Sequence, residues 1–118
     1  MAKNQTELSN DSTKNYAFLS GMSNDKYYPT NCVDKGKQIL VDLCAQIETQ
    51  QPQNLDELYR LTHAATNKFN SLEREFAKQG SEIETMAREC IALDFDFVAR
   101  TYGFEKADLE TLIAPREW

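Results

Sequence analysis

The chain has 118 residues, with 13 Lys and Arg against 19 Asp and Glu, and its formal net charge at pH 7 is -6. This length suits one domain with a core large enough to fold without disulfides or metal. The acidic balance argues against nucleic-acid binding, because affinity for a phosphate backbone depends mainly on Lys and Arg. It suits either a soluble protein or one that binds a basic partner.

The sequence also argues against a membrane protein or a secreted protein. No stretch approaches the ~18 apolar residues that a membrane span requires, and Met1–Glu7 contains no apolar run that could open a signal or an anchor. The cysteines are odd in number and widely spaced: Cys32, Cys44 and Cys90. We therefore expect reduced thiols and a cytoplasmic location.

The N-terminal residues 1–14 are rich in Asn, Ser, Thr, Lys and Asp, with almost nothing to bury. This composition predicts a disordered polar tail. Residues 15–118 then form a single predicted helical domain. We expect it to open with a short helix that starts at Tyr16 and ends near Gly21.

Two long helices are predicted next. The first covers residues 31–50 and carries apolar side chains at three- and four-residue spacing. Gly36 lies on this stripe, where it would allow the close approach of another backbone. The second helix begins at Asn54, which can cap it together with Glu57, and ends where Gly80 can adopt a left-handed conformation.

The third long helix is predicted over Ser81–Tyr102, with Ser81 as its N-cap and Glu84 completing a capping box. A final short helix is expected around Ala107–Ile113. No segment alternates apolar and polar residues as a half-buried strand would. The predicted fold is therefore all-α, a compact bundle of three long helices with short end helices that close its core.

Asp94 is the most informative residue of the third helix. On a helical wheel it falls in the middle of the apolar face, whereas Asp96 points nearly opposite. A carboxylate amid apolar side chains needs partners or must become neutral, because an unpaired buried charge is costly. Asp94 is therefore either a buried strut, paired with an arginine, a tyrosine hydroxyl or backbone N–H groups, or part of a binding site.

A polar stripe on the second helix provides candidate chemistry. Its members follow at four-, three- and four-residue spacing: Tyr59, His63, Thr66 and Asn70. If the stripe faces the third helix, His63 could approach Asp94, and a carboxylate that orients an imidazole is how a general base is built. No nucleophile completes such a site, so a solvated helix flank with an ordinary histidine is the alternative interpretation.

The sequence predicts no metal and no cofactor. It lacks a phosphate-binding loop, a dinucleotide fingerprint and a zinc-protease motif. Its single histidine does not belong to a Glu-x-x-His segment, which a di-metal carboxylate bundle would need.

The surface of the third helix offers a candidate docking site. Its outer face is predicted to carry Glu82, Glu89 and Asp96, which form either a solvated surface or an acidic patch that docks a basic protein. Trp118, a large apolar side chain, is expected to fold back onto the bundle.

Four passages of the sequence are similar to a small bacterial family of domains of unknown function: Val33–Leu40, Leu61–Thr66, Gly80–Glu89 and Leu112–Trp118. The resemblance covers residues 16–118. It implies a bacterial, single-domain protein. It implies no activity, because it carries no assigned reaction, cofactor or catalytic residue.

The sequence leaves two classes of function open. A small acidic helical bundle without a catalytic motif is typical of a non-enzymatic interaction module, such as an adaptor or an immunity-protein-like inhibitor of a basic toxin. The alternative is a small enzyme or ligand-binding protein that uses Asp94 and His63 in a pocket between the second and third helices. A deep polar pocket containing both residues would favour the alternative, and a flat surface patch would favour the module.

Overall fold

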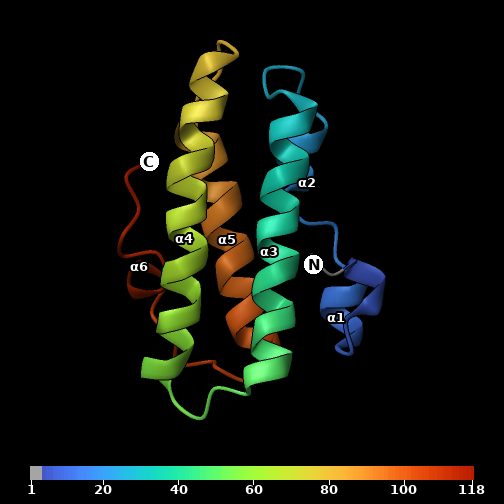
Figure 1. The fold of residues 1–118 in the computed structure, drawn as a ribbon, viewed down its shortest axis with the longest axis vertical. Coiled ribbons are helices and arrows are strands. Elements are labelled where there is room, and N and C mark those ends of the chain that lie inside the picture. The colour runs from blue at the N-terminus through green and yellow to red at the C-terminus, as the bar shows by residue number, and fades with distance from the viewer. Residues whose placement is uncertain (1–3) are drawn as a thin grey trace.

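Three long helices dominate the computed structural model, which describes residues 4–118 and contains no strand among them. The long helices are α3 (Thr30–Gln50), α4 (Leu55–Lys78) and α5 (Thr85–Thr101). Short loops join them, so consecutive helices run antiparallel, and Figure 1 shows α5 behind the α3–α4 pair. The prediction of an all-α bundle of three long helices with short end helices is confirmed.

Short helices cover both sides of this bundle. They are η1 (Gln5–Glu7), α1 (Asp11–Lys14), α2 (Ser20–Ser23) and α6 (Leu109–Leu112). In Figure 1, α1 and α2 lie on the α3 side and α6 lies beside α4. None of the helices formed by residues 4–118 is both long and apolar enough to span a membrane.

The limits of α4 agree with the sequence prediction. The Asn54 side chain accepts the backbone N–H of Glu57 at 2.9 Å, as an N-cap does. The Glu57 carboxylate accepts the N–H of Gln53 at 2.8 Å, one residue earlier than a capping box would require. At the other end Gly80 has a φ of 77°, the left-handed conformation that glycine adopts at no steric cost.

The start of α5 differs from the prediction. The helix begins at Thr85, and the N-cap is Glu84 rather than Ser81. The Glu84 carboxylate accepts the N–H groups of Met86 at 3.1 Å and Ala87 at 3.2 Å. The predicted capping box is therefore wrong, because Glu84 caps the helix with its own side chain and the residues before it remain a loop.

The predicted short helix near Tyr16 is also wrong. Residues 16–19 are not helical, and α2 starts only at Ser20. Leu19 has a φ of 52°, in the left-handed region, and this conformation ends any helix that would arrive from Tyr16.

Residues 4–28, which we call the N-terminal strap, lie against the bundle. The sequence predicts a disordered tail over residues 1–14, of which 1–3 lie outside the described residues. The structure instead folds residues 4–14 into η1 and α1, with Leu8 and Thr13 buried. The Gln5 amide donates hydrogen bonds to the carbonyls of Thr13 and Tyr16. The amino-acid composition does not predict this folded segment, because hydrogen bonds and a single buried leucine hold it in place.

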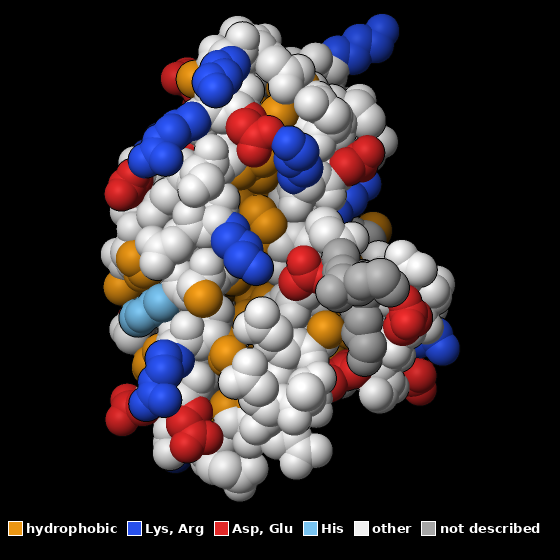
Figure 2. Space-filling view, in the orientation of Figure 1, with side chains coloured by type: hydrophobic (Ala, Val, Ile, Leu, Met, Phe, Trp, Pro, Cys, Tyr) orange, Lys and Arg blue, Asp and Glu red, His pale blue; other side chains and the backbone are white. Residues whose placement is uncertain are grey.

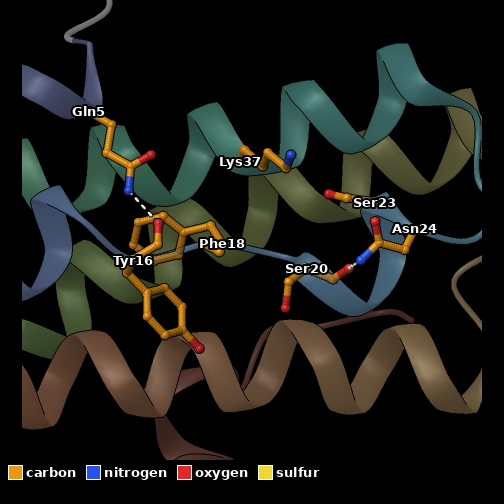
Figure 3. Close-up of a pocket in the computed structure, with 8 residues that line it drawn as sticks. Gln5, Tyr16, Phe18, Ser20, Ser23, Asn24 and Lys37 are labelled. Atoms are coloured by element: carbon orange, nitrogen blue, oxygen red, sulfur yellow. Dashed lines mark hydrogen bonds between the residues drawn. The ribbon is translucent and has the colours of Figure 1, made fainter.

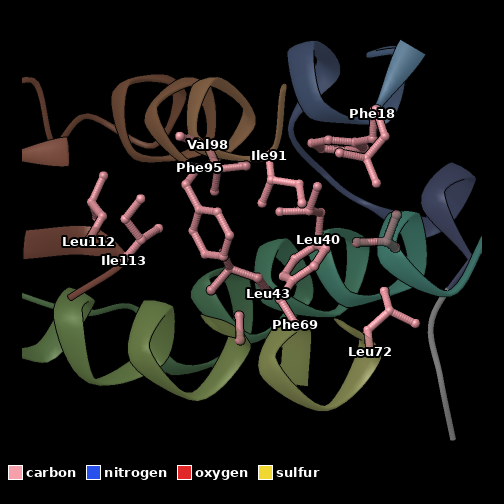
Figure 4. Close-up of a cluster of buried hydrophobic side chains, with 14 of the residues drawn as sticks. Phe18, Leu40, Leu43, Phe69, Leu72, Ile91, Phe95, Val98, Leu112 and Ile113 are labelled. Atoms are coloured by element: carbon pink, nitrogen blue, oxygen red, sulfur yellow. The ribbon is translucent and has the colours of Figure 1, made fainter. Parts of the chain in front are cut away.

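The hydrophobic core fills the space between the three long helices. Figure 4 shows it, with Phe69 from α4 and Phe95 from α5 near its centre. The two rings meet edge to face, with centroids 5.9 Å apart. Trp118 is buried and places its ring centroid 6.2 Å from that of Phe69, which confirms that it folds back onto the bundle. Each such buried aromatic side chain contributes about 1.5–3 kcal/mol relative to an exposed one.

Gly36 on α3 determines how closely the strap packs. A Cβ atom at this position would lie 2.8 Å from Leu19 Cδ1 and 3.2 Å from Phe69 Cε1. Leu19 itself is buried. The predicted close approach at Gly36 therefore exists, but side chains make it, whereas the sequence analysis expected another backbone.

Gly36→Ala should destabilise the protein by about 1 kcal/mol. An alanine gains about 1 kcal/mol in helix propensity, and overpacking a filled core costs about 1–3 kcal/mol, so the loss should exceed the gain. Gly21→Ala is the matched control, because its Cβ would meet only Cys90 Sγ at an ordinary 3.7 Å. Urea denaturation of both variants measures the difference, and equal stability would contradict this account of Gly36.

Candidate functional site

Asp94 lies inside the protein and is fully paired. It is only 4% exposed. The Tyr16 hydroxyl donates to its Oδ1 at 2.8 Å, and the Leu19 N–H donates to its Oδ2 at 2.7 Å. The Tyr16 ring also stacks on Phe97, with centroids 3.8 Å apart. The partners of Asp94 therefore come from the N-terminal strap, and no arginine is among them.

The surroundings of Asp94 shift the pKa values of both Asp94 and Tyr16. Burial raises the pKa of Asp94, and the hydrogen bonds from Leu19 and Tyr16 oppose this rise without cancelling it. Burial and the bond to Asp94 raise the pKa of Tyr16 to about 12. The tyrosine therefore keeps its proton at neutral pH and remains the donor.

Two further tyrosine–carboxylate pairs hold the strap. The Tyr28 hydroxyl donates to Glu84, and this bond is the main cause of the lowered pKa of the Glu84 carboxylate. On α3, Glu48 accepts the hydroxyl of Tyr102 and the N–H groups of Ser9 at 2.8 Å and Asn10 at 3.1 Å.

The Glu48 carboxylate therefore binds the backbone near the beginning of the strap. Burial alone would raise its pKa, but the hydrogen bonds from the strap and from Tyr102 outweigh burial and lower it. The strap is thus held by three carboxylates at separate places along its length: Glu48, Asp94 and Glu84.

The polar stripe on α4 binds the C-terminal segment, residues 105–118, of the same chain. The Tyr59 hydroxyl accepts the N–H of Asp108 at 3.1 Å. Nε2 of His63 lies 2.6 Å from the Thr111 carbonyl oxygen. Because a carbonyl only accepts hydrogen bonds, this contact requires the proton of a neutral His63 to be on Nε2.

The other two residues of the stripe also contact the C-terminal segment. The Thr66 hydroxyl donates to the Thr62 carbonyl at 2.8 Å and lies 3.5 Å from the Leu112 carbonyl. The Asn70 amide donates to the Pro115 carbonyl at 3.0 Å and accepts the Glu117 N–H at 2.8 Å. The stripe therefore pairs with backbone groups of the C-terminal segment that follows α5.

The structure does not join His63 to Asp94. His63 bonds to the C-terminal segment, and Asp94 bonds to the N-terminal strap. No hydrogen bond connects the two side chains among the described residues 4–118. The general-base arrangement that the sequence analysis considered depends on such a bond.

The predicted acidic face of α5 does not form as expected. Glu82 is exposed but lies in the loop before α5, because the helix starts at Thr85. Asp96 is half-buried and pairs with Arg100 at 2.9 Å. Glu89 alone of the three is an exposed residue on the helix itself.

Instead, α5 exposes apolar side chains. Leu93 is 62% exposed and Met86 is 42% exposed. Their spacing of seven residues places them on one line along the helix. The half-buried Cys90 lies between them on this line, and the half-buried Phe97 follows Leu93 one turn later. We call these four residues the α5 outer stripe. This stripe was not predicted from the sequence, although the helical wheel that places Asp94 on the apolar face also shows it.

The face formed by α3 and α4 carries charges of both signs. Figure 2 shows the side formed by α3 and α4, on which Lys and Arg alternate with Asp and Glu, and hydrophobic side chains are visible along the seam between the helices. Such mixed charge is typical of a solvated surface.

Metal-binding and thiol chemistry find no support in the described part of the chain. No group of three or more His, Cys, Asp and Glu side chains among residues 4–118 could hold a metal ion. The cysteines are free, with Cys32 and Cys44 buried and Cys90 half-buried. Burial raises the pKa of Cys44 to about 12, so this thiol is not reactive at neutral pH.

Comparison with known proteins places the chain in a family. Residues 12–118 match a family of unknown function, DUF5713. The chain belongs to this family. The resemblance to a domain family of unknown function is thereby confirmed over the whole predicted range, and a bacterial origin stays a prediction. Neither the curated proteins nor the solved structures that were compared include a match to this DUF5713 protein.

Asp94→Ala should lower the free energy of unfolding by about 1–3 kcal/mol more than Asp96→Ala does, because truncation leaves the buried Leu19 N–H without an acceptor. Asp96→Ala removes only a surface ion pair within one helix, which is worth about 0.3–0.5 kcal/mol. Paired urea denaturation curves measure the gap. Equal destabilisation would mean that the bonds to the strap contribute little.

Asp94 and Glu48 should affect stability with opposite pH dependence. Asp94 has a raised pKa in the folded protein. Between the ordinary value of about 3.9 and this raised pKa, the Asp94 carboxyl is protonated in the folded state and ionised in the unfolded state. This group therefore favours folding more strongly as pH falls. Glu48 has a lowered pKa, so its contribution is present above about 4.3 and is lost as pH falls through the lower folded value.

The measurement compares Asp94→Asn and Glu48→Gln with the unsubstituted protein over a series of pH values. The stability lost by Asp94→Asn should grow as pH falls, and the stability lost by Glu48→Gln should shrink. Parallel pH curves for the two variants would contradict the pKa directions given above.

Proposed function

We propose that this protein is a non-enzymatic interaction module that binds a basic protein partner through the outer side of α5. The observation that carries the proposal is the exposure of Leu93 and Met86 on one line of a helix whose opposite face is buried. Single exposed apolar residues are common, but two on one line with half-buried neighbours offer a continuous apolar strip for a partner.

Carboxylates near the strip support a basic partner, and the exposed Arg100 that continues the line of Leu93 is paired with Asp96. Glu89 is exposed one turn from Leu93, and the exposed Glu82 lies just before the helix. The whole chain carries a net charge of -6. Exposed carboxylates around an apolar contact steer a positively charged partner and reject a negatively charged one. An adaptor and an immunity-protein-like inhibitor both have this type of surface.

The polar residues inside the bundle support the same proposal. Asp94, His63 and Asn70 are engaged with the two ends of their own chain. The alternative, a small enzyme or ligand-binding protein that uses Asp94 and His63, has weaker support because it would require both residues to exchange these partners. A cytoplasmic location also belongs to the proposal, and the free cysteines support it.

The test places a photo-crosslinking amino acid at position 93 in the full-length protein, inside the cells that produce it. Position 64 is the matched control, because Ala64 is also exposed in a long helix but lies on α4. The expected result is an adduct with one basic protein from position 93 and none from position 64.

A second arm tests the stated chemistry. The purified complex should weaken when salt is raised from about 0.15 M to about 1 M, which shortens the screening length from about 8 Å to about 3 Å. Glu89→Lys should weaken it further, whereas Asp34→Lys, which reverses an exposed charge on α3, should not. Identical adducts from both positions, or an acidic partner, would refute the proposal.

A further inference from the structure

A second surface feature lies between α3 and the strap. It is a pocket of about 270 Å³. Its lining includes Tyr16, Phe18, Ser20, Ser23, Asn24 and Lys37. In Figure 3, Lys37 reaches from α3 toward the side where Ser23 and Asn24 lie, and Tyr16 and Phe18 lie on the other side. The pocket therefore has a cationic, polar end and an aromatic end.

Lys37 is the unusual member of this lining. It is half-buried, and its ammonium group makes no hydrogen bond and no ion pair with any other residue in 4–118. Lys35, two residues earlier, pairs with Glu75. Asp34 lies one turn before Lys37 on the same helix, yet the two side chains are not paired. A lysine that lines a pocket and has no counter-ion among the described residues can attract an anion there.

The neighbouring polar groups supply further contacts. The Ser23 hydroxyl donates to the Leu19 carbonyl at 3.1 Å, and the Asn24 amide donates to the Ser20 carbonyl at 3.2 Å. These bonds fix the polar end of the pocket. The Ser20 hydroxyl makes no hydrogen bond within residues 4–118, so a donor remains in the lining of the same pocket.

We propose that this pocket binds a small organic carboxylate, with the carboxylate group paired to Lys37 and the apolar part directed toward Phe18 and Tyr16. One lysine matches the single charge of a carboxylate, whereas the planar fork of an arginine, which favours bidentate phosphate binding, is not among the pocket's lining residues. The volume lies just under the ~300–1,000 Å³ of typical small-molecule sites, so the ligand must be small. The proposal rests on Lys37 and does not use the exposed Met86 and Leu93.

The pocket joins two parts of the molecule, and this gives a second readout. Lys37 belongs to α3, whereas Ser20, Ser23 and Asn24 belong to the strap. A ligand that contacts both should slow the opening of the strap, because binding stabilises the closed state by mass action. Amide hydrogen exchange in residues 16–24 should therefore slow when ligand is added, while exchange in α4 should change little.

The experiment uses benzoate as the probe, with neutral benzamide and inorganic phosphate as comparisons. Binding to the full-length protein is followed by ¹H–¹⁵N NMR up to concentrations on the order of 10 mM, since a ligand of this size is expected to bind weakly. Benzoate should shift the amides of residues 16–24 and 34–38, and benzamide and phosphate should shift them less.

Variants assign the effect to the lysine. Lys37→Met should weaken benzoate binding by about tenfold or more, the loss expected for a hydrogen bond to a charged group. Lys68→Met is the matched control, since Lys68 is an exposed lysine on α4, and it should leave binding unchanged. Lys37→Arg keeps the charge and should retain binding, which separates loss of charge from damage to the fold.

Three results would overturn the assignment. They are the absence of benzoate shifts in these segments, equal shifts from benzamide, and phosphate binding more tightly than benzoate at Lys37. The last result would give the pocket to a different class of anion. None of these outcomes bears on the crosslinking test at Leu93, so the two proposals can fail separately.

Discussion

A carboxylate buried in the middle of α5 holds the N-terminal strap against the three-helix bundle. Asp94 accepts the N–H of Leu19 and the hydroxyl of Tyr16, and the bond to Leu19 coincides with a left-handed residue whose side chain packs against Gly36. Moving any one of these groups would leave a buried donor unpaired or a cavity unfilled. The position of the strap, and with it the pocket at Lys37, therefore depends on this carboxylate.

Both ends of the chain are attached to the bundle by polar bonds that surround an apolar contact. At the N-terminal end, Glu48, Asp94 and Glu84 accept tyrosine hydroxyls, and the first two also accept backbone N–H groups of the strap. At the C-terminal end, the polar side chains of α4 pair with backbone groups while Trp118 packs on Phe69. Segments without regular structure need such partners, because unpaired backbone groups near the core are costly.

The polar residues inside the bundle are paired with other groups of the same chain. A binding function is therefore expected at the surface. Two surface features of the described residues are argued to bind ligands. One is the exposed line of Met86 and Leu93 on α5, and the other is the pocket beside the unpaired Lys37. They differ in chemistry, since the first suits a protein surface and the second suits a small anion. They adjoin at Tyr16, which lines the pocket and stacks on Phe97 of α5.

The sequence by itself determined the three long helices, because apolar spacing and the cap at Asn54 are local properties of the chain. It also determined that Asp94 is buried, since a helical wheel fixes which face a residue shares. It did not determine the partners of Asp94 or His63, because these come from segments 75 and 48 residues away in the chain. Only the tertiary structure decided that polar side chains inside the bundle hold the two chain ends, because hydrogen bonds between distant segments leave no periodic pattern in the sequence.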